Sequence, residues 1–371
     1  MTMAPRHARA GRGNRSARRR YDPSVPSSSA KIQLINLPRE LLFEIFHHCK
    51  PKNEERGNYY WWFNHETPAL FKLSRVNKYI RALSVPILFK HMRGSMKEEM
   101  LQSRLQEIEG NESILSAVRC LTVSVNGHGK PRELWEAQTP RKPCDASTPG
   151  LFAHVLSKMS NLQELFIEIE YADKSLEAPF RTELLSKGIT FPSVRDLKYH
   201  ISLNVSFVPD VFANLQVLHV CIQVSPKKTK GLATIASRLT LHTVDLFKAA
   251  KWREQDVEEI VDLFPSVVTL LVRGGLKATR PAKLIPIFQK FNSLVDLTLV
   301  TMTRMPSIPY LVSQGWLNGE DPKSMAMTFF QTCPRLARLQ FNTDVPIDVF
   351  VPKRQGDEVI GLLDETGKQV P

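Results

Sequence analysis

The sequence predicts an α/β protein in which a small all-α module precedes an irregular solenoid, with parallel strands on the concave face and helices outside. Three observations support this prediction. Two short helical patterns of apolar residues occur between residues 31 and 93. A strand-like template then recurs eight times from residue 118 onward. The spacing of its middle copies is typical of a structural repeat.

The template is an apolar residue followed by two others, three and five positions later. Its copies are Val118/Leu121/Val123, Leu162/Leu165/Ile167, Val194/Leu197/Tyr199, Leu215/Leu218/Val220, Leu241/Val244/Leu246, Val267/Leu270/Val272, Leu294/Leu297/Leu299 and Leu336/Leu339/Phe341. They begin 44, 32, 21, 26, 26, 27 and 42 residues apart. The middle steps fit leucine-rich repeats of roughly 20–29 residues, and the long steps indicate insertions. Because one unit cannot bury its own apolar face, the units have to stack.

Stacking places the second and third template residues in the core. We therefore expect seven leucines to be buried: Leu121, Leu165, Leu197, Leu218, Leu270, Leu297 and Leu339. Helices at 152–159, 256–264 and 282–291 are expected to form the opposite wall. The asparagine that such repeats place eight residues after the first apolar one occurs only as Asn126, which indicates an irregular array. The alternative is an ordinary α/β domain whose buried strands share the same spacing.

Composition divides the chain into four parts. Residues 1–30 form a basic tail that we expect to be disordered, and residues 31–93 form the helical module with an insertion at 51–68. The repeat array spans 94–345, and 346–371 is a C-terminal tail. The net charge is +13, but residues 1–20 hold seven arginines and no acid, which leaves +6 for the remainder. Arg18-Arg19-Arg20 is either a nuclear-import signal or a merely solvated run.

The compartment follows from what the sequence lacks. No stretch approaches the roughly 20 apolar residues that span a bilayer, and the first residues have no signal-peptide core. The five cysteines are scattered and odd in number, which is typical of a reducing compartment. We expect the protein in the cytoplasm, the nucleus or both, with no membrane association.

No catalytic, cofactor-binding or metal site is predicted. The sequence has no G-x-S-x-G, no phosphate-binding glycine loop and no H-E-x-x-H. His47-His48-Cys49 is a poor metal cluster, because adjacent residues on a helix point about 100° apart. The expected role is therefore binding, without an enzymatic activity.

Residues between and just after the buried template positions should line the concave face. The candidates for target binding among them are Phe166, Lys198, His200, Asp245, Phe247 and Arg273. We expect both phenylalanines to be exposed anchors, since large aromatic side chains are typical of binding hot spots. This mixture favours a protein ligand over nucleic acid, which would require more lysine and arginine.

The helical module carries a further pattern. Leu37-Pro38-Arg39-Glu40-Leu41-Leu42 is followed by Ile45-Phe46, and Leu73-Ser74-Arg75-Val76-Asn77-Lys78 by Pro86-Ile87-Leu88-Phe89. Together these residues resemble an F-box, particularly those of fungal F-box proteins, in which leucine-rich repeats often follow. The insertion at 51–68 departs from the family pattern.

The resemblance implies a partner and a function. F-box proteins dock onto a Skp-family adaptor, which links them to a cullin scaffold, and their repeats select the protein to be ubiquitylated. The implied adaptor-binding residues are Leu37, Pro38, Leu41, Ile45, Phe46, Leu73, Val76 and Leu88. The expected function is substrate recognition in a cullin-type (SCF) ubiquitin ligase. The alternative is a repeat scaffold, possibly nuclear, without a ubiquitin role, in which the module only caps the solenoid.

Overall fold

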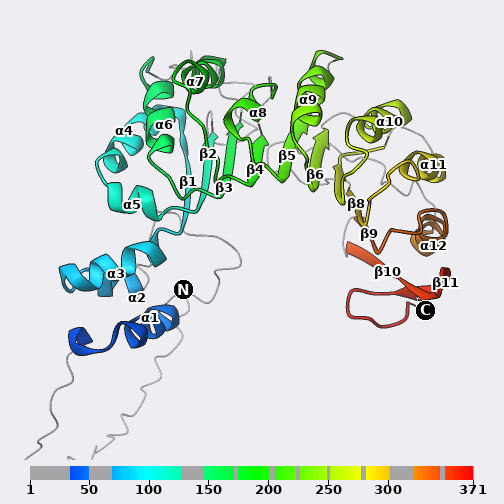
Figure 1. The fold of residues 1–371 in the computed structure, drawn as a ribbon, viewed down its shortest axis with the longest axis horizontal. Coiled ribbons are helices and arrows are strands. Elements are labelled where there is room, and N and C mark those ends of the chain that lie inside the picture. The colour runs from blue at the N-terminus through cyan, green and yellow to red at the C-terminus, as the bar shows by residue number, and fades with distance from the viewer. Residues whose placement is uncertain are drawn as a thin grey trace, which may run out of the picture.

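Within the described part of the chain, eleven strands lie side by side in one curved sheet, in their order along the sequence (Figure 1). The computed structural model describes residues 34–49, 69–126, 145–170, 174–200, 205–222, 226–248, 251–276, 281–300, 321–342 and 347–370. The predicted disordered tail at 1–30 and the insertion at 51–68 lie outside these ranges. None of the helices within them is long and apolar enough to cross a membrane.

The first nine strands are parallel. They are β1 (His91–Lys97), β2 (Cys120–Asn126), β3 (Glu164–Glu170), β4 (Asp196–His200), β5 (Val217–Ile222), β6 (Thr243–Lys248), β7 (Thr269–Arg273), β8 (Asp296–Val300) and β9 (Arg338–Asn342). The last two, β10 (Ile347–Gln355) and β11 (Glu358–Leu363), are antiparallel.

Helices connect successive strands and lie on the convex side of the arc (Figure 1). They are α4 (Glu98–Glu109), α5 (Glu112–Ala117), α6 (Thr148–Ser157), α7 (Lys174–Ser186), α8 (Val208–Val211), α9 (Pro226–Arg238), α10 (Glu254–Leu263), the 3-10 turn η3 (Pro281–Leu284), α11 (Ile285–Phe288) and α12 (Pro322–Thr332). The helices predicted at 152–159, 256–264 and 282–291 correspond to α6, α10 and η3 with α11. The structure is thus a mixed α/β fold with a long, mostly parallel sheet.

The leucine column of the template is the centre of the core. Leu121, Leu165, Leu197, Leu218, Val244, Leu270, Leu297 and Leu339 are paired across successive strands without a slip in register. All seven leucines expected to be buried are at most 3% exposed, so that prediction is confirmed. Their rows of methyl groups face the helices and exclude water between neighbouring units.

Two predicted boundaries were wrong. The sheet begins at His91, inside the segment assigned to the helical module, because Met92 pairs with Leu121 and Gly94 with Val123. A glycine at the third template position conceals this unit in the sequence. The expected C-terminal tail at 346–371 instead contains β10, which pairs antiparallel with β9, and β11, which pairs antiparallel with β10 and completes that end of the sheet.

The helical module consists of η1 (Leu34–Asn36), α1 (Arg39–His48), α2 (Ala69–Ser74) and α3 (Lys78–Leu88). Leu42, Phe46, Leu70 and Ile80 form its own buried cluster. Asn77 caps α3 by accepting a hydrogen bond from the Ile80 backbone N–H at 2.8 Å. These helices lie at the β1 end of the arc (Figure 1).

The module joins the array without a spacer. Leu88 packs against the small cluster of the module, whereas the next residue, Phe89, packs against the main core. The backbone carbonyl of Lys90 then accepts hydrogen bonds from the N–H groups of Arg119 and Cys120. Consecutive residues, Leu88 and Phe89, therefore belong to the two different cores, and packing of each against its own core fixes the chain at this junction.

A ladder of side-chain hydrogen bonds runs along the sheet edge at which the parallel strands begin. Asn161 donates to the carbonyl of Ser116 at 2.7 Å, Ser193 to Ser160 at 3.3 Å and Asn214 to Pro192 at 2.9 Å, and Arg335 donates to Asn292. Each donor immediately precedes the first template residue of its unit. The ladder ties neighbouring units together in an array whose sequence has only one asparagine at the usual repeat position.

Replacing Leu218 with alanine tests the core column. The change should lower the free energy of unfolding by about 2–5 kcal/mol, because it leaves a cavity between neighbouring strands. Leu185→Ala is the control, since Leu185 is an exposed apolar side chain, and it should cost less than about 0.5 kcal/mol. Equal effects of both changes in chemical denaturation would contradict the core assignment.

Replacing Asn214 with alanine tests the edge ladder. We expect the free energy of unfolding to fall by about 1 kcal/mol, because the carbonyl of Pro192 loses its side-chain donor. The matched control is Asn292→Ala, since Asn292 takes part in the ladder through its backbone carbonyl. The ladder would be refuted as a stabilising feature if the two variants unfolded at the same denaturant concentration.

Candidate functional site

The concave face is formed by the side chains that alternate with the core positions. Strand pairing aligns Thr122, Phe166, Lys198, His219, Asp245, Leu271, Thr298 and Gln340 in one row. A second row, two residues earlier on each strand, contains Cys120, Glu164, Asp196, Val217, Thr243, Thr269, Asp296 and Arg338. Residues of both rows share a face because the side-chain period of a strand is two.

The structure brings together only some of the predicted target-binding residues. Asp245 and Arg273 form an ion pair with 2.6 Å between Oδ2 and Nη2. Phe166 is half-buried and pairs in register with Lys198 on the next strand. His200 is the last residue of β4.

The expectation that Phe247 is an exposed anchor was wrong. Phe247 has the predicted register, opposite Cys221 and Arg273, but it is only 5% exposed. Residues 244–248 of β6 are all buried, including Asp245 and Lys248, so this strand is covered on both faces. Lys248 is compensated by Asp256, whose Oδ2 lies 2.5 Å from its Nζ.

A network of ionisable side chains crosses four strands at the middle of the concave face. The Nδ1 of His219 lies 2.6 Å from Asp245 Oδ2, the oxygen that also contacts Arg273. The Nε2 of the same imidazole lies 3.5 Å from Asp196 Oδ1. Sequence reasoning did not select His219 or Asp196 as binding residues, although the strand register pairs His219 with the predicted Asp245. Asp196 lies on β4, on the other side of His219 from Asp245.

A small hollow of about 80 Å³ lies beside this network. Its polar lining includes Glu164 and Asp196, which face one another on neighbouring strands, and Lys198. Burial raises the pKa of the Asp196 carboxyl; His219 and Lys198 oppose this shift, and the negative charges of Glu164 and Asp245 add to it. Burial and the adjacent Glu164 raise the pKa of the Cys120 thiol to about 12, so this cysteine is a poor nucleophile at neutral pH.

Other polar residues of the concave face are also paired across strands. Asp296 accepts a hydrogen bond from Arg338 at 3.1 Å, and Ser124 donates to Glu168 at 3.2 Å. Cross-strand pairs of this kind orient charges on a rigid sheet. In the described ranges, no three His, Cys, Asp or Glu side chains are grouped so that they could hold a metal ion.

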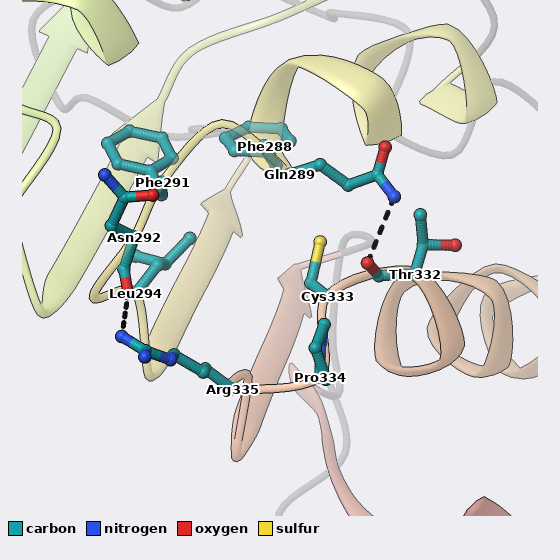
Figure 2. A pocket seen from close by; sticks show the side chains of 9 residues that line it. All are labelled: Phe288, Gln289, Phe291, Asn292, Leu294, Thr332, Cys333, Pro334 and Arg335. Atoms are coloured by element: carbon teal, nitrogen blue, oxygen red, sulfur yellow. Dashed lines mark hydrogen bonds between the residues drawn. The ribbon is translucent and has the colours of Figure 1, made fainter. Parts of the chain in front are cut away.

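A larger pocket of about 370 Å³ lies between the turns that precede β8 and β9 (Figure 2). Phe288, Phe291 and Leu294 form its apolar part, and Figure 2 shows the Cys333 thiol between them and the Pro334 loop. Gln289 donates to the Thr332 carbonyl at 3.2 Å, and Arg335 donates to Asn292. Burial raises the pKa of Cys333 to about 11, so its thiol also stays protonated at neutral pH.

The helical module presents apolar side chains to solvent. Leu41 is 50% exposed and Val76 is 63% exposed, with Ile35 and Tyr79 also exposed. Of the other predicted adaptor-binding residues, Pro38 is exposed, whereas Leu37, Ile45, Leu73 and Leu88 are half-buried. The assignment of Phe46 to this surface was wrong, because Phe46 is fully buried in the cluster of the module.

Ile35 and Tyr79 were missed by sequence reasoning. Neither belongs to the motif residues on which the family resemblance was based. Val76 lies between α2 and α3 and Tyr79 lies in the first turn of α3, so helical spacing in the sequence gave no signal that links them.

The two phenylalanines should respond differently to truncation. Phe247→Ala should lower the free energy of unfolding by about 3–5 kcal/mol, because the ring is buried. Phe166→Ala should lower it by less, because that ring is half-buried. Thermal denaturation of both variants measures the difference. A larger loss for Phe166→Ala than for Phe247→Ala would contradict the observed burial.

Comparisons with known proteins assign no family to the chain. No protein-family model matches it, and neither does any curated protein. Two features of the chain itself bear on its function: the exposed apolar side chains of the module and the charged concave face of the array.

Proposed function

We propose that the protein is the target-recognition subunit of a cullin-type (SCF) ubiquitin ligase. In this proposal the module of α1–α3 is an F-box that docks onto a Skp-family adaptor. The stacked units are degenerate leucine-rich repeats whose concave face binds the protein to be ubiquitylated. The observation that carries the proposal is the exposed apolar surface of the module.

That surface is concentrated in a short part of the chain. Among the described residues, seven large apolar side chains are exposed, and four of them lie between residues 35 and 79: Ile35, Leu41, Val76 and Tyr79. Full burial of an exposed apolar side chain contributes roughly 1.5–3 kcal/mol, and these side chains are 46–63% exposed, so covering one of them contributes about half as much. A partner would therefore have to cover several of them together and add polar contacts to exceed the entropic cost of association.

The concave face supports the second half of the proposal. Its ion pairs lie beside apolar side chains such as Phe166 and Leu271, a mixture typical of protein–protein interfaces. A nucleic-acid surface would need an excess of cations, whereas here Arg273 and Arg338 are each paired with an aspartate. We place the complex in the cytoplasm or nucleus, where the reducing environment suits the scattered cysteines.

The decisive experiment uses a variant with two charges on the exposed apolar surface. Leu41→Asp with Val76→Asp should weaken capture of a purified Skp-family adaptor by 100-fold or more, roughly 3 kcal/mol, because two carboxylates would be desolvated without partners. Both side chains are at least half exposed, so the fold should tolerate the changes. Ile45 is avoided because it packs against the core of the module.

Two other exposed apolar residues provide the control. Val295→Asp with Ile360→Asp adds the same charge at positions that are 39% and 47% exposed but lie in the array. This variant should bind the adaptor as the wild type does. Failure of the wild-type chain to bind any Skp-family adaptor would reject the ligase role and favour a repeat scaffold without a ubiquitin function.

A further inference from the structure

The central charged network of the concave face has a geometry that depends on one proton. His219 on β5 lies between two carboxylates, with Nδ1 2.6 Å from Asp245 Oδ2 on β6 and Nε2 3.5 Å from Asp196 Oδ1 on β4. His219 is 12% exposed and Asp245 is 6% exposed. Three neighbouring strands therefore meet at one nearly buried imidazole.

A neutral imidazole cannot donate to both carboxylates while both are ionised. It carries one N–H, which the shorter contact assigns to Nδ1 and Asp245. The lone pair of Nε2 then faces the negative charge of Asp196. In the imidazolium form both ring nitrogens donate, and each carboxylate receives a charge-assisted hydrogen bond.

From this arrangement we propose that Asp196, His219 and Asp245 form a proton-operated switch on the concave face. With the proton bound, His219 links β4 to β6 through two hydrogen bonds. When the proton leaves from Nε2 to solvent, the link to Asp196 is lost and the face gains one negative charge. Imidazole is the side chain whose ordinary titration lies between pH 5 and 8, so this is the range over which the proposal is tested.

The surrounding charges have opposing effects on the switch. Glu164 on β3 and Asp245 on β6 favour the protonated state, whereas Lys198 on β4 and Arg273 on β7 favour loss of the proton. Burial also raises the pKa of Asp196, which strengthens the tendency of the folded cluster to retain a proton. Asp196 Oδ1 is buried and accepts no hydrogen bond from any described residue, so a donor at Nε2 would satisfy it.

The direction of the effect on stability follows from linkage. Two carboxylates next to one imidazole interact more favourably with its charged form than with its neutral form, so the proposed stabilisation is present while the proton is bound and is lost as pH rises. If the concave face binds a target as proposed above, loss of the proton frees Asp196 for a cationic group of that target. This last step alone rests on the proposed function.

The test uses the full chain without any partner. Melting temperatures are measured between pH 5.5 and 8.5 for the wild type, His219→Gln and Asp196→Asn. The melting temperature of the wild type minus that of His219→Gln should fall by about 2 °C or more as the pH rises from 5.5 to 8.5. A fall of this size corresponds to the loss of one hydrogen-bonded ion pair. Asp196→Asn should reduce the dependence of the melting temperature on pH as His219→Gln does. The control is His242→Gln at an exposed histidine, which should follow the wild type.

A second measurement is independent of the stability of the variants. In a wild-type chain labelled with ¹⁵N-histidine, Nδ1 of His219 should remain an N–H throughout, while Nε2 changes from N–H to unprotonated nitrogen as pH rises. The proposal is overturned if neither nitrogen changes, or if Nδ1 is the one that loses its proton. Parallel melting profiles of the wild type and His219→Gln would overturn it as well. These results do not depend on adaptor binding, so they fail or succeed separately from the ligase proposal.

Discussion

The register between parallel strands is the constraint on which the other features depend. One residue before each paired segment, a backbone N–H donates to the carbonyl of the preceding unit, from Arg119 to Lys90 through to Ala337 to Val295, at 2.7–3.0 Å. A slip by one residue would move every leucine of the core to the solvent face. The burial of the leucine column and these backbone hydrogen bonds therefore require the same alignment of the strands.

The same register separates the apolar core from the charged concave face. Core residues and face residues alternate along each strand, so the apolar column can stabilise the stack while its neighbours carry charge. Asp245 and Arg273 come from units 26 residues apart in the repeat, yet the register places them in contact. The charged residues of the concave face are in this way positioned by the sheet itself.

Repetition is also the reason why part of the structure could be predicted. The seven buried leucines follow from a pattern that each unit restates, so one misread unit does not alter the others. The β1 unit escaped notice because Gly94 occupies a template position, and the C-terminal hairpin because antiparallel strands do not share the template. The β1 unit and the C-terminal hairpin lie at the two ends of the sheet, where the repeat pattern ends.

The errors at single side chains have a different origin. Phe247 and Phe46 are in the expected elements, but their burial depends on neighbours that are distant in the sequence. For Phe46 the burial comes from packing with residues of α2 and α3. Sequence periodicity indicates which way a side chain points, whereas the degree of burial depends on what covers it.

The position of the side-chain ladder accounts for the variable length of the units. Asn161, Ser193, Asn214 and Arg335 act at the edge where the strands begin, while the long segments 127–144 and 301–320 follow directly after β2 and β8. Residues inserted after the end of a strand leave the ladder and the leucine column intact, and the entropic cost of a longer connection grows only slowly with its length. Units that begin 21 and 44 residues apart can therefore share one register.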